Sequence, residues 1–261
     1  MLPNRIRQKL NNNEIVFGAA LQLDSPWLVE MCGMAGFDYV MLDGEHGFAS
    51  YNMPNLILAA NAAGISPIVR VPNHDRGFIL PAMDAGAGGI HIPMVNDPEQ
   101  ARALVKEVKY EPIGNRGFSM ATRASGYGSL SREAHVEAAN RDMLLMLTLE
   151  TVEAIRHAGE IADIPGVDMI FIGRDDLAES FGVKDRNAPE VREAIRQVLE
   201  QVGGKVPVGT TAFSTEDVRL WTGLGVRFLL TGTTRTIRIA LENVYGELRK
   251  GLSSSSRLEG V

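Results

Sequence analysis

Residues 37–47 of this chain read FDYVMLDGEHG, an apolar run of strand length that ends in two acids and a histidine set among glycines. An apolar strand that ends in this way puts its polar groups at the rim of a sheet, where glycines let the backbone turn sharply or approach a ligand. Asp43 and His46 are the first candidates for chemistry. We expect other strands to supply the same kind of rim.

Apolar runs of strand length alternate with helical patterns along the chain, with no break in composition between them. The expected strands cover residues 15–21, 37–43, 68–71, 90–92, 143–149, 167–172, 206–209 and 226–230. The expected helices cover residues 4–10, 25–36, 51–63, 79–84, 98–110, 151–162, 189–201, 215–224 and the stretch up to about 249. Right-handed parallel crossovers between such units favour one α/β domain, a closed (β/α)8 TIM barrel of roughly 250 residues.

The alternative fold is an open doubly wound sheet, which in dinucleotide-binding proteins carries a glycine-rich fingerprint after its first strand. The glycines at 223 and 225 lack the third glycine and precede a strand, and residues 203–206 lack the spacing and the hydroxyl residue of a phosphate-binding loop. We therefore expect one barrel domain over residues 1–250, followed by a mobile tail over residues 251–261.

The composition is that of an ordinary globular protein, with 45% apolar and 22% charged residues in a chain of 261. A net charge of −6 argues against a broad nucleic-acid-binding surface, which needs a basic face. No stretch reaches the roughly 18 uncharged apolar residues of a membrane span, and the first residues lack the apolar core of a signal peptide. Cys32 is the single cysteine, so we expect a buried thiol in a soluble, cytoplasmic protein.

Polar side chains stand at the predicted carboxyl ends of several strands. They are Asp43 and His46 after the second strand, Arg70 at the third, Glu150 after the fifth and Asp176 just after the sixth. In a parallel barrel these ends gather at one mouth. A base, a fixed cation and two carboxylates suit metal-assisted chemistry on a small anionic substrate that bears a carbonyl group.

Each of these residues also has a purely structural interpretation. Glu150 and Asp176 can be acids favoured at helix N-termini, Arg70 can be the ion-pair partner of an acid, and His46 can be a loop histidine. Taken together at neighbouring strand ends, the two carboxylates favour a Mg²⁺ or Mn²⁺ site with open positions for water and substrate. Asp43 is near enough in sequence to orient His46 as a general acid or base.

Several separated motifs resemble those of the HpcH/HpaI aldolases, a family of metal-dependent class II pyruvate aldolases. The motifs are GFD at 36–38, LDGEH at 42–46, PIVR at 67–70, LET at 149–151 and FIG at 171–173. Residues 110–125 also resemble the long loop of that family. The resemblance covers nearly the whole chain, and it implies a barrel enzyme.

The resemblance implies that Glu150 and Asp176 hold a divalent metal that binds the carboxylate and keto oxygen of a 2-oxo acid. Mg²⁺ or Mn²⁺ is the expected ion, with Co²⁺ or Zn²⁺ as alternatives. Arg70 would stabilise the enolate oxygen, and His46, oriented by Asp43, would transfer protons through water. The implied lyase reaction is reversible cleavage of a 4-hydroxy-2-oxo acid into pyruvate, or a related 2-oxo acid, and an aldehyde.

Further candidates for substrate contact are Gly173, Arg174, Asp175 and Arg123. Asp84 matches a family acid near a subunit contact or the mouth. A class I aldolase would need a Schiff-base lysine, and no lysine lies at a predicted carboxyl strand end.

Some positions depart from the usual residues of the family. Thr148 replaces a glutamine, Arg174 and Asp175 replace a proline and a small residue, and Thr234 replaces an aspartate. Two alternatives therefore stay open: a carboligating relative, for example one that forms citrate from oxaloacetate and an acyl donor, and a non-catalytic barrel that binds a keto acid. The resemblance also implies a homo-oligomer, either a dimer or a hexamer built from dimers that exchange their last barrel helix.

Overall fold

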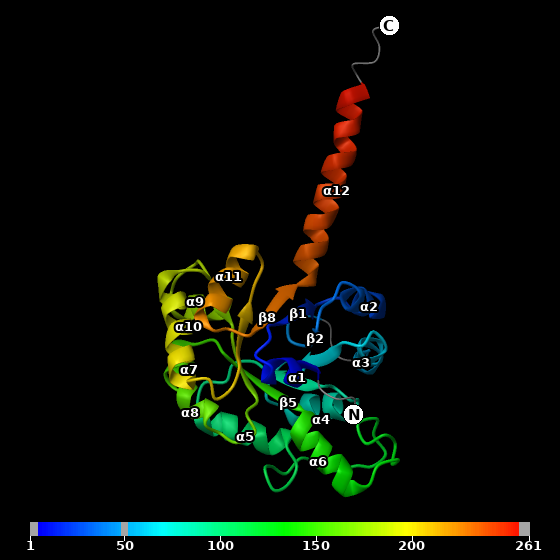
Figure 1. Ribbon diagram of the computed structural model, residues 1–261, viewed down its shortest axis with the longest axis vertical. Helices are drawn as coiled ribbons and strands as arrows, with labels where there is room; N and C mark the ends of the chain where they lie inside the picture. The colour runs from blue at the N-terminus through cyan, green and yellow to red at the C-terminus, as the bar shows by residue number, and fades with distance from the viewer. Residues whose placement is uncertain (1–4, 48–51, 256–261) are drawn as a thin grey trace.

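Eight parallel strands close into a barrel, in which each strand pairs with the next and β8 pairs with β1 (Figure 1). The computed structural model describes residues 5–47 and 52–255. The strands are β1 Val16–Leu21, β2 Tyr39–Asp43, β3 Ser66–Arg70, β4 Gly89–Ile92, β5 Leu144–Leu149, β6 Met169–Ile172, β7 Val208–Thr211 and β8 Phe228–Gly232. The predicted single TIM barrel is confirmed.

Helices surround the barrel and connect its strands. They are α1 Arg5–Asn11, α2 Pro26–Met34, α3 Met53–Ala62, α4 Arg76–Asp84, α5 Pro98–Val108, α6 Arg132–Asp142, α7 Val152–Arg156, α8 Ala158–Ala162, α9 Arg174–Ser180, α10 Pro189–Val202, α11 Thr215–Leu224 and α12 Thr233–Ser255. Ser25 caps α2 as its side chain accepts from the backbone N–H of Leu28 at 3.3 Å, with Pro26 at the first helical position.

The helices differ from the sequence-based prediction in number and in some of their bounds. The structure adds α6 and α9, and it divides the helix expected over residues 151–162 into α7 and α8 at His157. α9 has seven residues and begins directly after β6, so it offers little periodicity to recognise. The helix expected from residue 51 begins at Met53, and Tyr51 itself lies outside the described residues.

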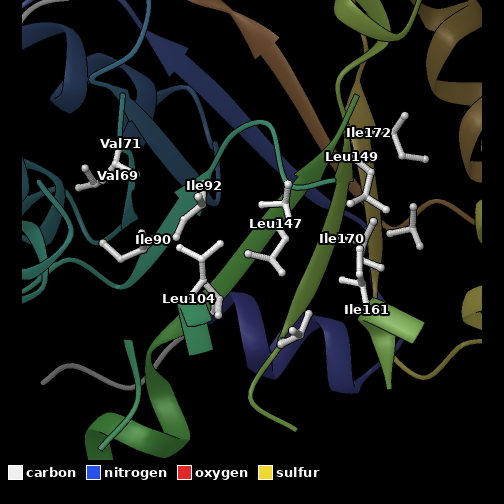
Figure 2. Close-up of a cluster of buried hydrophobic side chains, with 14 of the residues drawn as sticks. Val69, Val71, Ile90, Ile92, Leu104, Leu147, Leu149, Ile161, Ile170 and Ile172 are labelled. Carbon is white, nitrogen blue, oxygen red and sulfur yellow. The ribbon is translucent and has the colours of Figure 1, made fainter. Parts of the chain in front are cut away.

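One large apolar cluster lies between the strands and the helices. Figure 2 shows Val69, Ile90, Leu147 and Ile170 from four neighbouring strands, together with Leu104 of α5. All five side chains are buried. This packing holds the strands rigidly, and therefore fixes the side chains that leave the strands on the opposite face.

A second cluster fills the barrel lumen, and it includes Met41, Ile68 and Phe171. Successive side chains of a strand point to opposite faces, so residues two positions further along the strand point to the lumen as well. Asp43 follows Met41 by two positions, and Arg70 follows Ile68 by two. Both polar residues are thereby placed at the carboxyl end of the lumen.

The last helix, α12, extends away from the barrel (Figure 1). It runs through Ser255, so residues 251–255 are helical where the sequence suggested a tail from residue 251. The rest of that expected tail, residues 256–261, lies outside the described residues. No helix in the described part of the chain combines the length and the apolar character needed to cross a bilayer.

Candidate active site

Asp43 and Arg70 form an ion pair at the carboxyl ends of β2 and β3. They are direct partners in the parallel register. Arg70 donates from Nε to Asp43 Oδ1 at 2.9 Å and from Nη2 to Asp43 Oδ2 at 2.6 Å. Burial alone would raise the pKa of the Asp43 carboxyl, but its hydrogen bonds and the charge of Arg70 together hold that pKa below its usual value. Asp43 is therefore an ionised anchor.

The turn after β2 is also organised by Asp43. Its Oδ1 accepts the backbone N–H groups of Glu45 at 3.2 Å and His46 at 3.1 Å, and its Oδ2 accepts from the amide of Gln22 at 3.1 Å. Gln22 in turn accepts from the hydroxyl of Thr234 at 3.0 Å. Sequence reasoning missed Gln22, although it directly follows β1 and so stands at the same rim.

Glu45, which had no predicted role, lies between the guanidinium of Arg70 and the ring of His46. Its Oε2 lies 2.9 Å from Arg70 Nη1 and 3.6 Å from His46 Nε2. Asp43 holds the backbone of His46, and Glu45 is the carboxylate beside its ring, so the orientation of the ring by Asp43 stays a prediction. The His46 side chain is 64% exposed. It can exchange protons with solvent.

Glu150 and Asp176 lie on neighbouring elements at the same mouth. Glu150 follows β5 and is buried, and its Oε1 accepts the backbone N–H of Met94 at 2.7 Å. Burial raises the pKa of Glu150 to about 7, and the negative charges of Asp176 and Glu45 act in the same direction. Asp176 is exposed in the first turn of α9. Three carboxylates thus share one electrostatic neighbourhood, which a cation would stabilise.

Gly173 is required by the position of Glu150. A Cβ atom at Gly173 would lie 2.3 Å from Glu150 Oε2, far inside contact distance. Glycine therefore leaves the space that the buried carboxylate occupies, and Gly173 belongs to this site.

The donor set at this mouth consists of carboxylate oxygens, which suit a hard divalent cation. Over residues 5–47 and 52–255, no group of three or more His, Cys, Asp and Glu side chains is arranged to hold a metal. The predicted pair of Glu150 and Asp176 fits an ion that takes its remaining ligands from water and substrate.

Arg174 is buried and paired within the chain, and its predicted contact with substrate stays a prediction. Its buried guanidinium donates to the backbone oxygen of Thr211 at 2.8 Å, lies 3.5 Å from Asp217 and packs over the ring of Trp221. Asp175 is paired with Arg186 at 3.1 Å on the surface. Arg174 therefore connects α9 to β7 and α11.

Arg123 lies at the opposite end of the barrel, and its predicted contact with substrate stays a prediction. It lines a cavity of about 800 Å³ together with Ser66, the first residue of β3, and Gly88, just before β4. Its Nη1 donates to the backbone oxygen of Ala85 at 3.1 Å. Asp84 lies at the same end, where it pairs with Arg116 at 3.0 Å. Neither contacts the carboxylate mouth within this chain.

Comparison with known proteins gives a consistent result. The sequence model described as HpcH/HpaI aldolase/citrate lyase matches residues 17–219. A 5-keto-4-deoxy-D-glucarate aldolase from Enterobacter sp. (strain 638) is 33% identical over 238 residues, which cover 89% of this chain and 91% of that protein. A hydroxypyruvate/pyruvate aldolase from Pseudomonas aeruginosa is 31% identical over 266 residues, which cover 99% of this chain and 97% of that protein. The crystal structure of citrate synthase SbnG matches with a TM-score of 0.85 and 28% identity, over 94% of this chain and 98% of that chain.

Proposed function

The chain belongs to the HpcH/HpaI aldolase/citrate lyase family, and we propose that it is a divalent-metal-dependent aldolase that cleaves 4-hydroxy-2-oxo acids. The products are pyruvate, or a related 2-oxo acid, and an aldehyde. The observation that carries this proposal is the Asp43–Arg70 pair, which holds a cation beside the carboxylates of Glu45 and Glu150 at one barrel mouth.

Glu150 and Asp176 would hold the metal, which is Mg²⁺ or Mn²⁺ in this proposal. When bound, the ion supplies a Lewis acid that polarises the ketone of the substrate. The raised pKa of Glu150 supports this assignment, because a buried carboxylate beside two others is stabilised by a cation that neutralises them.

Arg70 is the group that meets the developing enolate. Its guanidinium is oriented by two bonds to Asp43, and its side chain stays 17% exposed at the mouth. A fixed donor of this kind stabilises negative charge that develops on the C2 oxygen without having to reorganise.

The reaction needs a base and then an acid, and it needs no further reactant. A base takes the proton of the C4 hydroxyl, the C3–C4 bond breaks, and its electrons move to the C2 oxygen as the aldehyde leaves. A proton added at C3 then gives pyruvate. His46 performs these transfers through water, since its exposed ring stands beside Glu45 in the turn after β2.

A carboligating reaction is the second candidate, and the similarity to citrate synthase SbnG favours considering it. It would form a carbon–carbon bond between a 2-oxo acid, such as oxaloacetate, and an acyl donor. A non-catalytic barrel that senses a keto acid is the third. Neither requires a different arrangement of Arg70 and Glu150.

The test is a screen of 4-hydroxy-2-oxo acids with the purified protein and Mg²⁺ or Mn²⁺, with pyruvate release as the readout. We expect release that stops when EDTA is added and returns with excess metal. Product from oxaloacetate and an acyl donor, without pyruvate release, would favour the carboligase. Saturable binding without any turnover would favour the sensor and contradict the aldolase.

Burial of Cys32 agrees with the inert thiol expected from the sequence, and burial raises the pKa of that thiol to about 11. The cytoplasmic location stays a prediction. So does the homo-oligomer, which is proposed as a dimer or a hexamer.

A further inference from the structure

A buried polar pair, His91 and Thr148, lies in the lumen next to the proposed site. Thr148 precedes Glu150 by two positions, so both side chains leave the β5 end on the lumen side. His91 is the register partner of Arg70 on β4. The two side chains are buried, and His91 Nε2 is hydrogen-bonded to Thr148 Oγ1. Thr148 therefore lies one layer below Glu150 in the lumen, and His91 lies beside Arg70.

The surroundings of His91 determine which of its nitrogens carries the proton. Nδ1 lies 3.1 Å from the sulfur of Met41, and the ring meets Phe171 edge to face at 5.0 Å. A thioether has no hydrogen to donate, so Nδ1–H faces the sulfur and Nε2 is the acceptor. Burial, with the charge of Arg70, lowers the pKa of His91 to about 3. The ring is neutral.

Thr148 is thereby left as an acceptor. Its hydroxyl hydrogen is directed to His91 Nε2, so the lone pairs of Oγ1 are what it can offer to a ligand. Apolar residues would fill this layer without the cost of burying a hydroxyl and an imidazole. A polar pair that faces the site is thus explained by recognition of a hydrogen-bond donor.

We propose that Thr148, held by His91, is a specificity-determining residue that selects 2-oxo acids bearing a hydroxyl group on the carbon next to the ketone. The inference rests on the proposed function, in which the ketone lies between Arg70 and the Glu150–Asp176 pair. The adjacent carbon is then close to the lumen floor. A hydroxyl there donates to a lone pair of Thr148 Oγ1, whereas the methyl group of pyruvate has no hydrogen to donate to it. His91 is a positioning residue in this arrangement.

Selection of this kind is effective because a site built to bind a hydroxyl disfavours the analogue that lacks it. One hydrogen bond to a neutral partner corresponds to a preference of roughly tenfold. The Thr148–His91 pair therefore predicts a preference for a hydroxyl-bearing 2-oxo acid over pyruvate, which a purely structural role would not produce.

The experiment measures aldol addition to one fixed aldehyde with Mn²⁺-loaded protein, using hydroxypyruvate or pyruvate as the donor. The quantity compared is the ratio of the two kcat/KM values. We expect the wild type to favour hydroxypyruvate, and Thr148→Val, which keeps the shape, to lower the ratio about tenfold. Thr148→Ser keeps the hydroxyl and should keep the ratio. His91→Phe should lower it, because Thr148 loses its fixed orientation.

Phe171→Leu is the matched control, since it disturbs the same layer without removing the hydrogen bond. An unchanged ratio in Thr148→Val overturns the inference, and so does an equal change in Phe171→Leu. If Thr148→Val does not fold, Thr148→Ala replaces it under the same criteria. If the wild type turns over neither donor, the proposed function has failed. In that case the Kd values of hydroxypyruvate and pyruvate are measured on Mn²⁺-loaded wild type and Thr148→Val. A ratio of the two Kd values that is the same in both proteins overturns the role of Thr148 Oγ1 as a hydrogen-bond acceptor.

Discussion

Arg70 and Asp43 are bound to each other through two hydrogen bonds across neighbouring strand ends, of 2.9 and 2.6 Å. Asp43 is fully buried, and Arg70 keeps one further contact, from Nη1 to Glu45 at 2.9 Å. The sequence left two interpretations of Arg70 open, a structural ion pair and a substrate ligand. The structure shows the ion pair, and the pair itself gives the guanidinium the fixed orientation that a ligand of an enolate needs.

Replacing Arg70 by alanine tests both roles together. Cleavage should fall by roughly 10²–10³-fold, because the oriented donor is lost. Stability should also fall, on the order of 3 kcal/mol, because Asp43 stays buried without its cation. Turnover of a 4-hydroxy-2-oxo acid and urea unfolding measure the two effects. Arg70→Lys keeps the charge without the forked geometry and should be intermediate in both. Normal turnover in Arg70→Ala would exclude the enolate role.

His46 should matter for turnover without affecting stability. Its side chain is 64% exposed, so His46→Ala should unfold at the wild-type temperature while turnover falls by roughly 10²-fold or more. Glu45→Gln is the comparison, because it keeps the shape beside the ring and changes only the charge. We expect a smaller loss of turnover there. Full activity of His46→Ala would reassign proton transfer to another group.

Glu150→Gln should separate metal binding from folding. The amide keeps an oxygen for the Met94 N–H, and it removes a negative charge beside Asp176 and Glu45. The metal-free variant should therefore be at least as stable as the wild type, while its melting temperature no longer rises with Mn²⁺. Asp175→Asn is the control, since that carboxylate is paired with Arg186. Undiminished Mn²⁺ binding to Glu150→Gln, measured by calorimetry, would remove Glu150 from the ligand set.

The barrel and the position of Asp43, Arg70 and Glu150 were predictable because strand ends of a closed parallel sheet meet at one mouth. Arg174 is the first residue of α9, so its side chain direction is set by the helix, and it packs against β7 and α11. The partner of the His46 ring could not be predicted, because side-chain directions in a turn depend on its backbone geometry.

Arg123 lies at the other end of the barrel from Arg70 for a topological reason. Loops that follow a strand lie at the carboxyl end of the barrel, and loops that follow a helix return to the other end. Residues 109–131 follow α5 and precede α6 and β5, so their loop belongs to the second kind. The motif in residues 110–125 indicates membership of the family, but it does not show at which end of the barrel the loop lies.

The loss of stability at acidic pH should depend on His91. Its folded pKa of about 3 lies below the unfolded value near 6.5, so the unfolded chain binds this proton first as pH falls. The contribution of the neutral His91 to the free energy of unfolding is fully present above pH 6.5 and falls as the pH drops below that value. One such histidine lowers the free energy of unfolding by about 2 kcal/mol at pH 5. His91→Gln should lose less stability between pH 7 and pH 5 in urea unfolding. Phe171→Leu, without a titrating group, should keep the wild-type dependence. Parallel curves for His91→Gln and wild type would contradict the assignment.

The exposed faces of α2 and α12 lead to a prediction about assembly. On α12, Leu241, Val244, Tyr245 and Leu248 are each between 59% and 70% exposed, at the spacing of one helical face. On α2, Trp27 is 77% exposed. Apolar surface of this extent is characteristic of an interface, so we expect light scattering to report a dimer or a hexamer.

A double substitution on α12 tests whether that helix makes the contact. Val244→Asp with Leu248→Asp should shift the protein towards monomer, because two charges would be buried at the interface without partners. Glu242→Ala with Glu247→Ala is the matched control on the same helix, as both side chains are exposed and each is paired with a neighbour on α12. The monomeric variant should keep the far-UV spectrum of the barrel, since α12 extends away from it. A wild-type monomer, or an unchanged mass in the aspartate variant, would exclude this face.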